Sequence, residues 1–126
     1  MQMQILVLDD EKIVGERLKD SLEKEGHTVE IFINPAAALS RIREKVFDVV
    51  ITDIRMDDID GIQVLGEVRE KSTKTKVIMI TGYATLEVAR ESLTKGAFDF
   101  IAKPFKLREI REAIKKAEDA LQEGQN

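Results

Sequence analysis

Three aspartates of this sequence follow apolar runs, where an ionised carboxylate is costly. Asp9 and Asp10 follow QILVL at residues 4–8, and Asp53 follows VVIT at residues 49–52. A carboxylate beside a buried strand loses hydration, which it recovers only from a partner charge, a metal ion or hydrogen bonds. If the three side chains meet, each raises the pKa of the others, and a hard divalent cation relieves the repulsion. Oxygen ligands without His or Cys favour Mg²⁺ (or Mn²⁺), so the pattern predicts a magnesium site.

Two further groups end later apolar runs. Thr81 closes KVIMIT at residues 76–81, and Lys103 follows FDFIA at residues 98–102. A metal site with a mobile cation and a hydroxyl donor on its far side suits phosphoryl transfer, which depends on positioning and on neutralising charge on three equatorial oxygens. In that chemistry, Asp53 is the candidate nucleophile and would form an aspartyl phosphate.

These groups converge only if strands and helices alternate along the chain. Short apolar runs predict strands at residues 4–8, 48–52, 76–81 and 98–102, and the alternating pattern of TVEIFI predicts another at residues 28–33. The first run, QILVL, is continuous, which is typical of a strand buried on both faces of a parallel sheet. Helical spacing predicts a helix after each strand. The apolar positions of the five predicted helices are, in chain order, Ile13, Val14, Leu18 and Leu22; Ala36, Leu39, Ile42 and Val46; Ile62, Leu65 and Val68; Leu86, Ala89 and Leu93; and Leu107, Ile110, Ile114, Ala117 and Leu121.

The ends of the first two helices carry typical signals. Gly26 is expected to end the first helix, and Asn34 with Pro35 to begin the second. Five strands alternating with five helices predict a three-layer α/β domain, with a parallel sheet covered on both faces. In such sheets the functional crevice lies at the carboxyl ends of the strands. In the strand order 2-1-3-4-5, the first and third strands are neighbours, and the three aspartates would meet at one rim.

Composition limits the classes of function. The 126 residues suffice for one domain; 43% are hydrophobic and 35% are charged. The net charge of -4 argues against a nucleic-acid surface, which needs a basic excess. The absence of cysteine excludes disulfides and thiolate metal sites and fits a reducing compartment. The short N-terminal apolar run predicts neither a signal peptide nor a membrane span. We therefore expect a cytoplasmic protein without direct contact to nucleic acid or membrane.

Five segments in order, LVLDDE, VITDIRM, the DG at residues 60–61, ITGY and AKPF, resemble the motifs of the receiver domain of bacterial response regulators. These chemotaxis-regulator-like domains belong to two-component systems. The resemblance covers residues 4 to about 120. It implies a flavodoxin-like (βα)5 fold with a parallel five-stranded sheet in the order 2-1-3-4-5. It also implies a single receiver domain over residues 1–126, with an ordered core of about 4–121 and a tail or linker start at 122–126.

The resemblance also implies a role for each acidic residue. Asp53 would be the phosphorylated residue, the phosphoacceptor for a histidine kinase's phosphohistidine. Asp10 and Asp53 would bind Mg²⁺ directly, and Asp9 would help partly through water. The backbone carbonyl of Arg55 would complete the metal site.

A second set of residues would respond to phosphorylation. By the resemblance, Thr81 would move its hydroxyl onto the phosphoryl oxygens and Lys103 would pair with them. Phe100 would then turn inward into the vacated space. Pro104 corresponds to the proline after the family's lysine, which often follows a cis peptide bond.

Three residues are expected to tune the site. The family commonly has proline four positions after the phosphorylated aspartate, where this chain has Asp57. Losing proline frees the backbone and adds a carboxylate near the metal, whose charge Arg55 would offset. Asp57 would then strengthen cation binding or reshape the loop. The alternative, that Asp57 is only a solvated acid of the loop, is equally favoured by the sequence. Tyr83 and Arg55 would tune the lifetime of the phosphoryl group.

The implied function is a phosphorylation-dependent signalling switch in a phosphorelay. A histidine kinase or a small phosphodonor would phosphorylate Asp53 with Mg²⁺, adding about 1.5 to 2 negative charges. The face made by the fourth helix, fifth strand and fifth helix, about residues 84–121, would then change for dimerisation or for contact with an effector domain or protein. The domain would catalyse only its own phosphorylation and dephosphorylation, and so would not be a conventional enzyme. The wording of ITDIRMDDIDG and GAFDFIAKPF is most similar to receivers of enhancer-binding transcription regulators.

Other functions remain as alternatives. A haloacid-dehalogenase-like phosphohydrolase also uses Asp, Thr, Lys and magnesium, but it needs two aspartates separated by one residue, whereas Asp9 and Asp10 are adjacent. A pseudo-receiver would bind partners without phosphorylation, and the intact site residues argue against it. A nucleotide switch lacks its motifs, since no GxxxxGK or GxGxxG is present. The only histidine, His27, is expected to be a solvated loop residue at the opposite end of the sheet.

Overall fold

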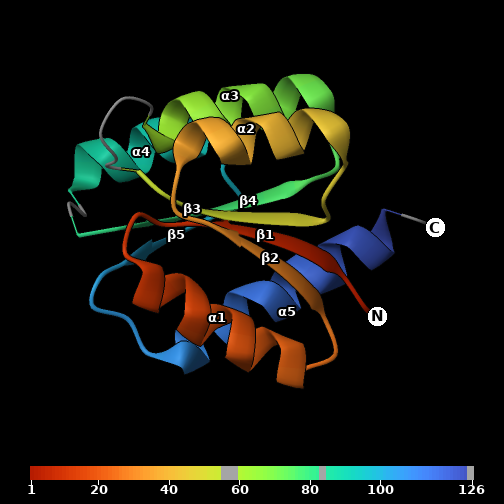
Figure 1. The fold of residues 1–126 in the computed structure, drawn as a ribbon. Coiled ribbons are helices and arrows are strands. Elements are labelled where there is room, and N and C mark those ends of the chain that lie inside the picture. Colours follow the sequence, from red (N-terminus) through yellow and green to blue (C-terminus); the bar gives the residue numbers. More distant parts are fainter. Residues whose placement is uncertain (55–59, 83–84, 125–126) are drawn as a thin grey trace.

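The protein alternates strands and helices along its whole length (Figure 1). The computed structural model describes residues 1–54, 60–82 and 85–124. The strands are β1 (Gln4–Leu8), β2 (Thr28–Phe32), β3 (Val49–Asp53), β4 (Lys76–Thr81) and β5 (Asp99–Ala102). The helices are α1 (Lys12–Lys24), α2 (Pro35–Glu44), α3 (Gly61–Lys71), α4 (Leu86–Thr94) and α5 (Leu107–Glu123).

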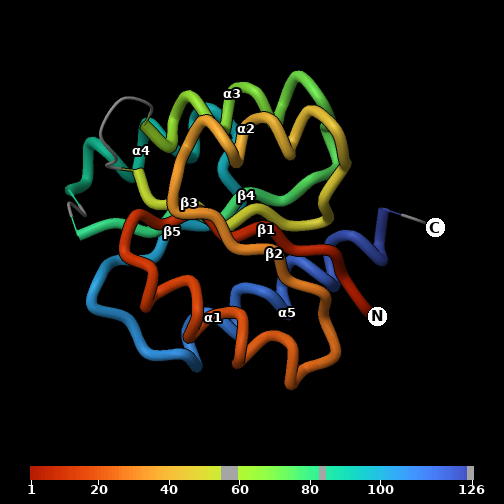
Figure 2. Tube along the Cα trace, in the orientation of Figure 1, coloured from red at the N-terminus to blue at the C-terminus, as the bar shows by residue number. Residues whose placement is uncertain are grey.

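The five strands form one parallel sheet in the order β2-β1-β3-β4-β5, as the sequence predicts. In Figure 1, α1 and α5 cover one face of this sheet, and α2, α3 and α4 cover the other. The trace in Figure 2 shows β1, β3 and β4 ending at the same edge, at the left of the view. The predicted three-layer α/β architecture is confirmed.

The alternation of side chains along each strand divides the core into two clusters. In β1, Ile5 and Val7 pack in the cluster beneath α1 and α5. Leu6 and Leu8 pack in the cluster beneath α2 and α3. All four side chains are fully buried, which explains why this strand is apolar at every position. The backbone that carries Asp9 is therefore held by packing on both faces.

The expected signals at the helix ends operate as predicted. Gly26 has a φ of 95°, which a glycine adopts without strain just after α1. Asn34 is the N-cap of α2, and its side chain accepts a hydrogen bond of 3.1 Å from the backbone N–H of Ala37. Pro35 begins that helix.

Three helices bury other residues than the sequence predicts. In α1, Ile13 is exposed. Val46 lies beyond α2, because the backbone at Lys45 is already extended, and its side chain is exposed. In α4, Leu86 and Leu93 are exposed, whereas Ser92 is buried. The Ser92 hydroxyl donates a hydrogen bond of 2.9 Å to the carbonyl of Val88, and this bond allows a polar side chain to face the core.

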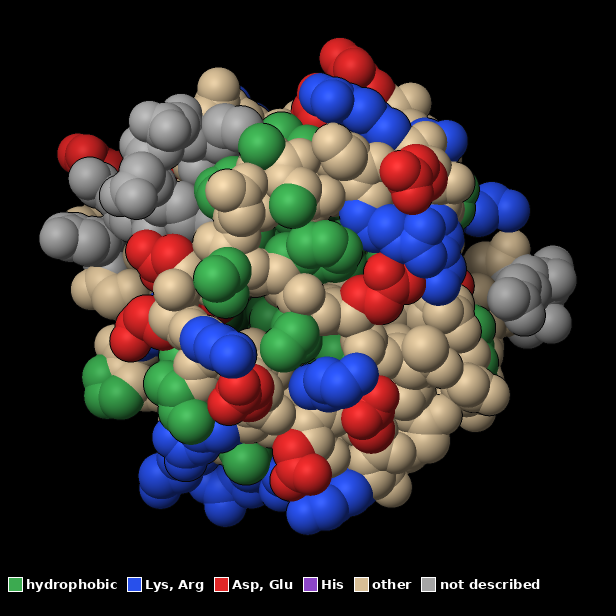
Figure 3. Space-filling view, in the orientation of Figure 1, with side chains coloured by type: hydrophobic (Ala, Val, Ile, Leu, Met, Phe, Trp, Pro, Cys, Tyr) green, Lys and Arg blue, Asp and Glu red, His purple; other side chains and the backbone are tan. Residues whose placement is uncertain are grey.

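Charged side chains are interspersed by sign over much of the face shown in Figure 3. One such group joins β2 to α2, where Glu30 accepts a hydrogen bond of 2.8 Å from Arg41 Nε and one of 3.2 Å from Lys45 Nζ. The pKa of Glu30 is lowered, chiefly by its hydrogen bond with Arg41. Among the described residues, no helix is both long and apolar enough to span a membrane.

His27 is buried, and the expectation of a solvated loop residue is wrong. Only 8% of the residue is exposed, and its Nδ1 accepts a hydrogen bond of 3.1 Å from the backbone N–H of Met3. Accepting at Nδ1 requires the unprotonated nitrogen. Burial lowers the pKa of His27 and outweighs the opposing effect of Glu118.

We therefore predict a loss of stability in acid that depends on His27. A histidine whose pKa is lowered on folding binds its proton more readily in the unfolded chain, so its contribution is complete above the unfolded pKa of 6.5 and is lost as the pH falls below that value. Urea unfolding at pH 7.5, 6.5 and 5.5 should show His27→Gln losing less stability with acid than wild type, by at most about 1.4 kcal/mol per pH unit. Identical pH profiles for the two proteins would refute this role.

Candidate functional site

The first and third strands bring three aspartates together at the carboxyl edge of the sheet. Asp9 directly follows β1, and Asp53 is the last residue of β3, one residue further than the predicted strand. Leu8 pairs with Thr52, so the ends of these neighbouring strands lie side by side. One carboxylate oxygen from each of Asp9, Asp10 and Asp53 lies within 4.8 Å of the others.

The three carboxylates differ in their surroundings. Asp9 and Asp53 are only 1% and 6% exposed, whereas Asp10 is exposed. Asp9 Oδ1 accepts a hydrogen bond of 2.8 Å from the backbone N–H of Glu11. Burial raises the pKa of Asp9 and outweighs the lowering effects of Lys103 and of this hydrogen bond. The cluster is thus open on the Asp10 side and desolvated on the Asp9 side.

Lys103 places a positive charge beside this cluster. Its Nζ donates a hydrogen bond of 2.8 Å to Asp53 Oδ2 and lies 2.8 Å from Asp9 Oδ2. A third hydrogen bond, of 3.1 Å, goes to Glu11 Oε1. Burial alone lowers the pKa of Lys103, but its contacts with Asp53, Asp9 and Glu11 prevail and raise it, so the group stays cationic.

The loop after β5 carries Lys103 to this position. Its backbone N–H donates a hydrogen bond of 2.8 Å to the carbonyl of Thr81, which anchors the loop to the end of β4. The Lys103–Pro104 peptide bond is cis, as the resemblance led us to expect. Thr81 is fully buried at the end of β4. Phe100 is partly buried and packs against the core cluster beneath α2 and α3.

The structure adds one residue to the predicted site and leaves the predictions for three others untested. Glu11 was missed as a partner of Lys103, and its only signal in the sequence was its place as the third acid of LVLDDE. Arg55, Asp57 and Tyr83 lie outside the described residues, so the predictions for them stand as they are.

The residues present fit a divalent cation. Three carboxylates within a few ångströms form the all-oxygen donor set that Mg²⁺ and Mn²⁺ take. Asp9 Oδ2 is buried, and within the described part of the chain it accepts no hydrogen bond of good geometry, although Lys103 Nζ is near. Such an oxygen retains an electron pair for a metal or for a water bound to it.

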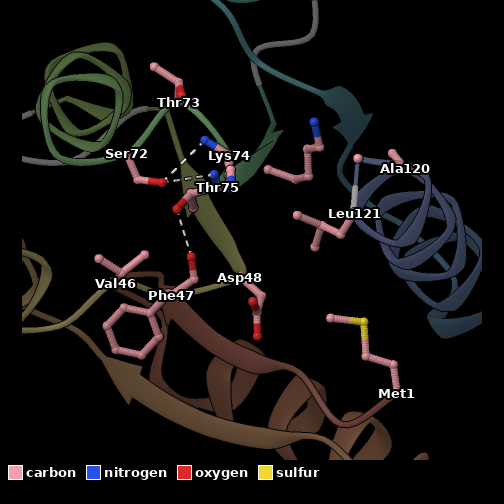
Figure 4. Close-up of a pocket in the computed structure, with 12 residues that line it drawn as sticks. Met1, Val46, Phe47, Asp48, Ser72, Thr73, Lys74, Thr75, Ala120 and Leu121 are labelled. Carbon is pink, nitrogen blue, oxygen red and sulfur yellow. Dashed lines mark hydrogen bonds between the residues drawn. The ribbon is translucent and has the colours of Figure 1, made fainter. Parts of the chain in front are cut away.

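A hollow at the opposite edge of the sheet has a different character. It has a volume of about 290 Å³, and its lining includes Phe47, Asp48, Ser72 and Thr75 (Figure 4). The Thr75 hydroxyl donates a hydrogen bond of 2.6 Å to the carbonyl of Phe47, and Ser72 Oγ accepts from the backbone N–H of Thr75 at 3.3 Å. These polar groups stabilise the turn before β4 and do not converge on the space.

Comparisons with known proteins agree with this geometry. A family model described as the response regulator receiver domain matches residues 5–115. The regulatory protein AtoC of Escherichia coli K12 is 40% identical over 113 residues, covering 90% of this chain and 24% of AtoC. The transcriptional regulatory protein ZraR of Klebsiella oxytoca is 35% identical over 116 residues, covering 92% of this chain and 26% of ZraR. The chain thus spans about a quarter of the length of these relatives.

Solved structures show the same fold. The CheY-like receiver domain of Methanospirillum hungatei JF-1 superposes with a TM-score of 0.90 at 34% identity, covering 98% of this chain and 99% of that one. A receiver domain of Clostridium thermocellum gives 0.86 at 29% identity, covering 97% and 96%. Together with the strand order and the acidic edge, these matches show that the chain belongs to the response regulator receiver domains of two-component signal transduction.

Proposed function

We propose that this domain is a phosphorylation-dependent switch. Asp53 would accept a phosphoryl group from a histidine kinase or from a small phosphodonor such as acetyl phosphate, with Mg²⁺ held by Asp9, Asp10 and Asp53. The observation that carries this proposal is the placement of Lys103 Nζ, 2.8 Å from both Asp53 and Asp9 at the carboxyl edge of the sheet. A nucleophilic carboxylate, a cation and an oxygen-donor metal site are thereby combined within one small volume.

The transfer follows from these groups. A carboxylate oxygen of Asp53 attacks phosphorus, and the bond from phosphorus to the donor breaks. The electron pair leaves with acetate or with the imidazole nitrogen of the kinase's histidine, and Asp53 becomes an acyl phosphate. Lys103 offsets negative charge on the phosphoryl oxygens throughout. A bound Mg²⁺ would supply the remaining charge neutralisation and help to orient the phosphoryl group.

The response to phosphorylation would pass through β4 and β5. The new group adds about 1.5 to 2 negative charges and three strong acceptors, which attract Lys103 and the hydroxyl of Thr81. The hydrogen bond from Lys103 N–H to the Thr81 carbonyl already links the ends of these strands. Phe100 lies in β5 and packs against the core cluster beneath α2 and α3. Its side chain would adjust to the movement of Thr81.

The proposed output face consists of α4, β5 and α5. Leu86 and Leu93, one face of α4, are 67% and 50% exposed, and apolar side chains that are exposed close together favour contact with a partner. The partner would be a second copy of the domain, or an effector domain or protein. The names of the relatives, a regulatory protein and a transcriptional regulatory protein, support a regulatory output.

We further infer that residues 1–126 form a single receiver domain, whose partner kinase and phosphodonors act in the cytoplasm. The single unbroken sheet, with both faces covered by helices, supports one domain. As in the sequence-based prediction, the domain would turn over only its own phosphoryl group.

Intact mass spectrometry after incubation with acetyl phosphate and Mg²⁺ tests the function. Wild type should gain one phosphoryl group, Asp53→Asn none, and the control Asp20→Asn one, because Asp20 pairs with Lys24 on the exposed side of α1. Light scattering on the same samples reports whether phosphorylation doubles the molar mass.

An adduct on Asp53→Asn, or none on wild type with any donor or kinase, would refute the proposal. Repeated release of phosphate from a phosphomonoester would instead favour the phosphohydrolase.

A further inference from the structure

Within the described part of the chain, Lys103 has three carboxylate partners, and one of them differs from the other two. Asp9 and Asp53 are buried members of the acidic edge, whereas the Glu11 side chain is 60% exposed. Glu11 Oε1 lies 3.1 Å from Lys103 Nζ, against 2.8 Å for each aspartate. Glu11 therefore holds the same ammonium group from outside the proposed metal cluster.

The main chain fixes Glu11 at this place. Its backbone N–H donates a hydrogen bond of 2.8 Å to Asp9 Oδ1, so the residue is tied to the acidic edge although its side chain is exposed. Glu11 is also the N-cap of α1, but its side chain makes no capping hydrogen bond. An acidic residue at a helix start usually serves the helix, and here the carboxylate turns to Lys103 instead.

Glu11 and Lys103 also line an open hollow of about 690 Å³ between α1 and the loop after β5. Val14, Pro104 and Phe105 form part of its wall. The Lys103 ammonium group thus lies between two acceptor sets, the buried aspartates on one side and Glu11 at the hollow on the other.

We propose that Glu11 is a positioning residue that competes with the phosphoryl group for Lys103. This inference rests on the proposed function, since it assumes that a phosphoryl group forms on Asp53. Exposed ion pairs are weak, so Glu11 restrains Lys103 weakly and yields it when a stronger anion forms. Removing the Glu11 carboxylate should therefore raise the affinity of the site for a phosphoryl-like anion by about twofold to fivefold.

The test measures binding of beryllofluoride, which mimics a phosphoryl group on a carboxylate, by fluorine NMR at fixed Mg²⁺. We expect Glu11→Gln to bind it about twofold to fivefold more tightly than wild type. Glu16→Gln is the matched control, because it removes the same charge from α1 while its partner is the exposed Lys12, at 3.7 Å. It should bind as wild type does.

The same substitution in a Lys103→Met protein distinguishes an effect on the position of Lys103 from an effect of the Glu11 charge alone. In Lys103→Met there is no ammonium group to hold, so adding Glu11→Gln should leave the affinity unchanged. An equal gain in both backgrounds means that Glu11 acts by its field alone, and the inference is then wrong. It is also wrong if Glu11→Gln matches Glu16→Gln. If wild type takes up neither beryllofluoride nor a phosphoryl group, the proposed function itself fails.

Discussion

Replacing Gly61 by alanine is expected to destabilise the protein by about 2–3 kcal/mol and to slow phosphorylation of Asp53. A Cβ at Gly61 would lie 2.5 Å from the carbonyl oxygen of Asp53 and 2.8 Å from the Cα of Ile54. Both atoms are backbone, so no side-chain rotation relieves the collision. The Gly61 N–H also donates a hydrogen bond of 2.8 Å to the carbonyl of Ile54, which fixes the start of α3 against the end of β3. The new methyl group would therefore displace Asp53, the proposed nucleophile.

Gly66 provides the control on the same helix. A Cβ there has nothing within 4 Å, so Gly66→Ala should stabilise the protein by about 0.5–1 kcal/mol through helix propensity alone. Urea unfolding measures both variants, and intact mass after acetyl phosphate measures the phosphorylation rate. The steric explanation fails if Gly61→Ala gains stability as Gly66→Ala does.

Replacing Lys103 by methionine is expected to slow phosphorylation about 10²-fold, the typical effect of removing one charge-stabilising group from an active site. Without Mg²⁺, the variant should also lose stability, because the buried carboxylates of Asp9 and Asp53 would lose the ammonium group that lies 2.8 Å from each of them. A fully buried pair broken in this way loses roughly 3–5 kcal/mol. The Lys103 side chain is 16% exposed and Asp10 opens the site to water, so we expect about 1–3 kcal/mol.

Mg²⁺ should restore part of this loss. Mg²⁺ would bind only the folded form of the proposed site, and in Lys103→Met the ammonium group no longer competes with it, so the thermal midpoint should rise more with Mg²⁺ in this variant than in wild type. Lys12→Met is the control, since it makes the same chemical change at an exposed pair with Glu16. An equal response to Mg²⁺ in Lys103→Met and wild type would show that Lys103 does not share the metal's ligands.

The sequence alone determined the order of the elements and the edge that carries the site. The buried strands β1 and β3 are largely apolar, and residues that an apolar strand excludes stand at three strand ends: Asp9 after β1, Asp53 at the end of β3 and Lys103 after β5. Parallel strands place such ends at one edge, so position along the chain was enough to bring these groups together. The order of the motifs also identified the family, because those motifs contain the residues at the strand ends on which both the fold and the site depend.

The tertiary structure alone decided which side chains face inward where the apolar pattern was ambiguous. His27 is buried because its nitrogen finds the backbone N–H of Met3, and Ser92 because its hydroxyl bonds within its own turn. Leu86 and Leu93 share a helical stripe, yet α4 turns that stripe outward. The contact of Glu11 with Lys103 joins residues 92 positions apart. Local propensity reports how a residue suits its own strand or helix, whereas hydrogen bonds and ion pairs across the fold depend on distances that only packing sets.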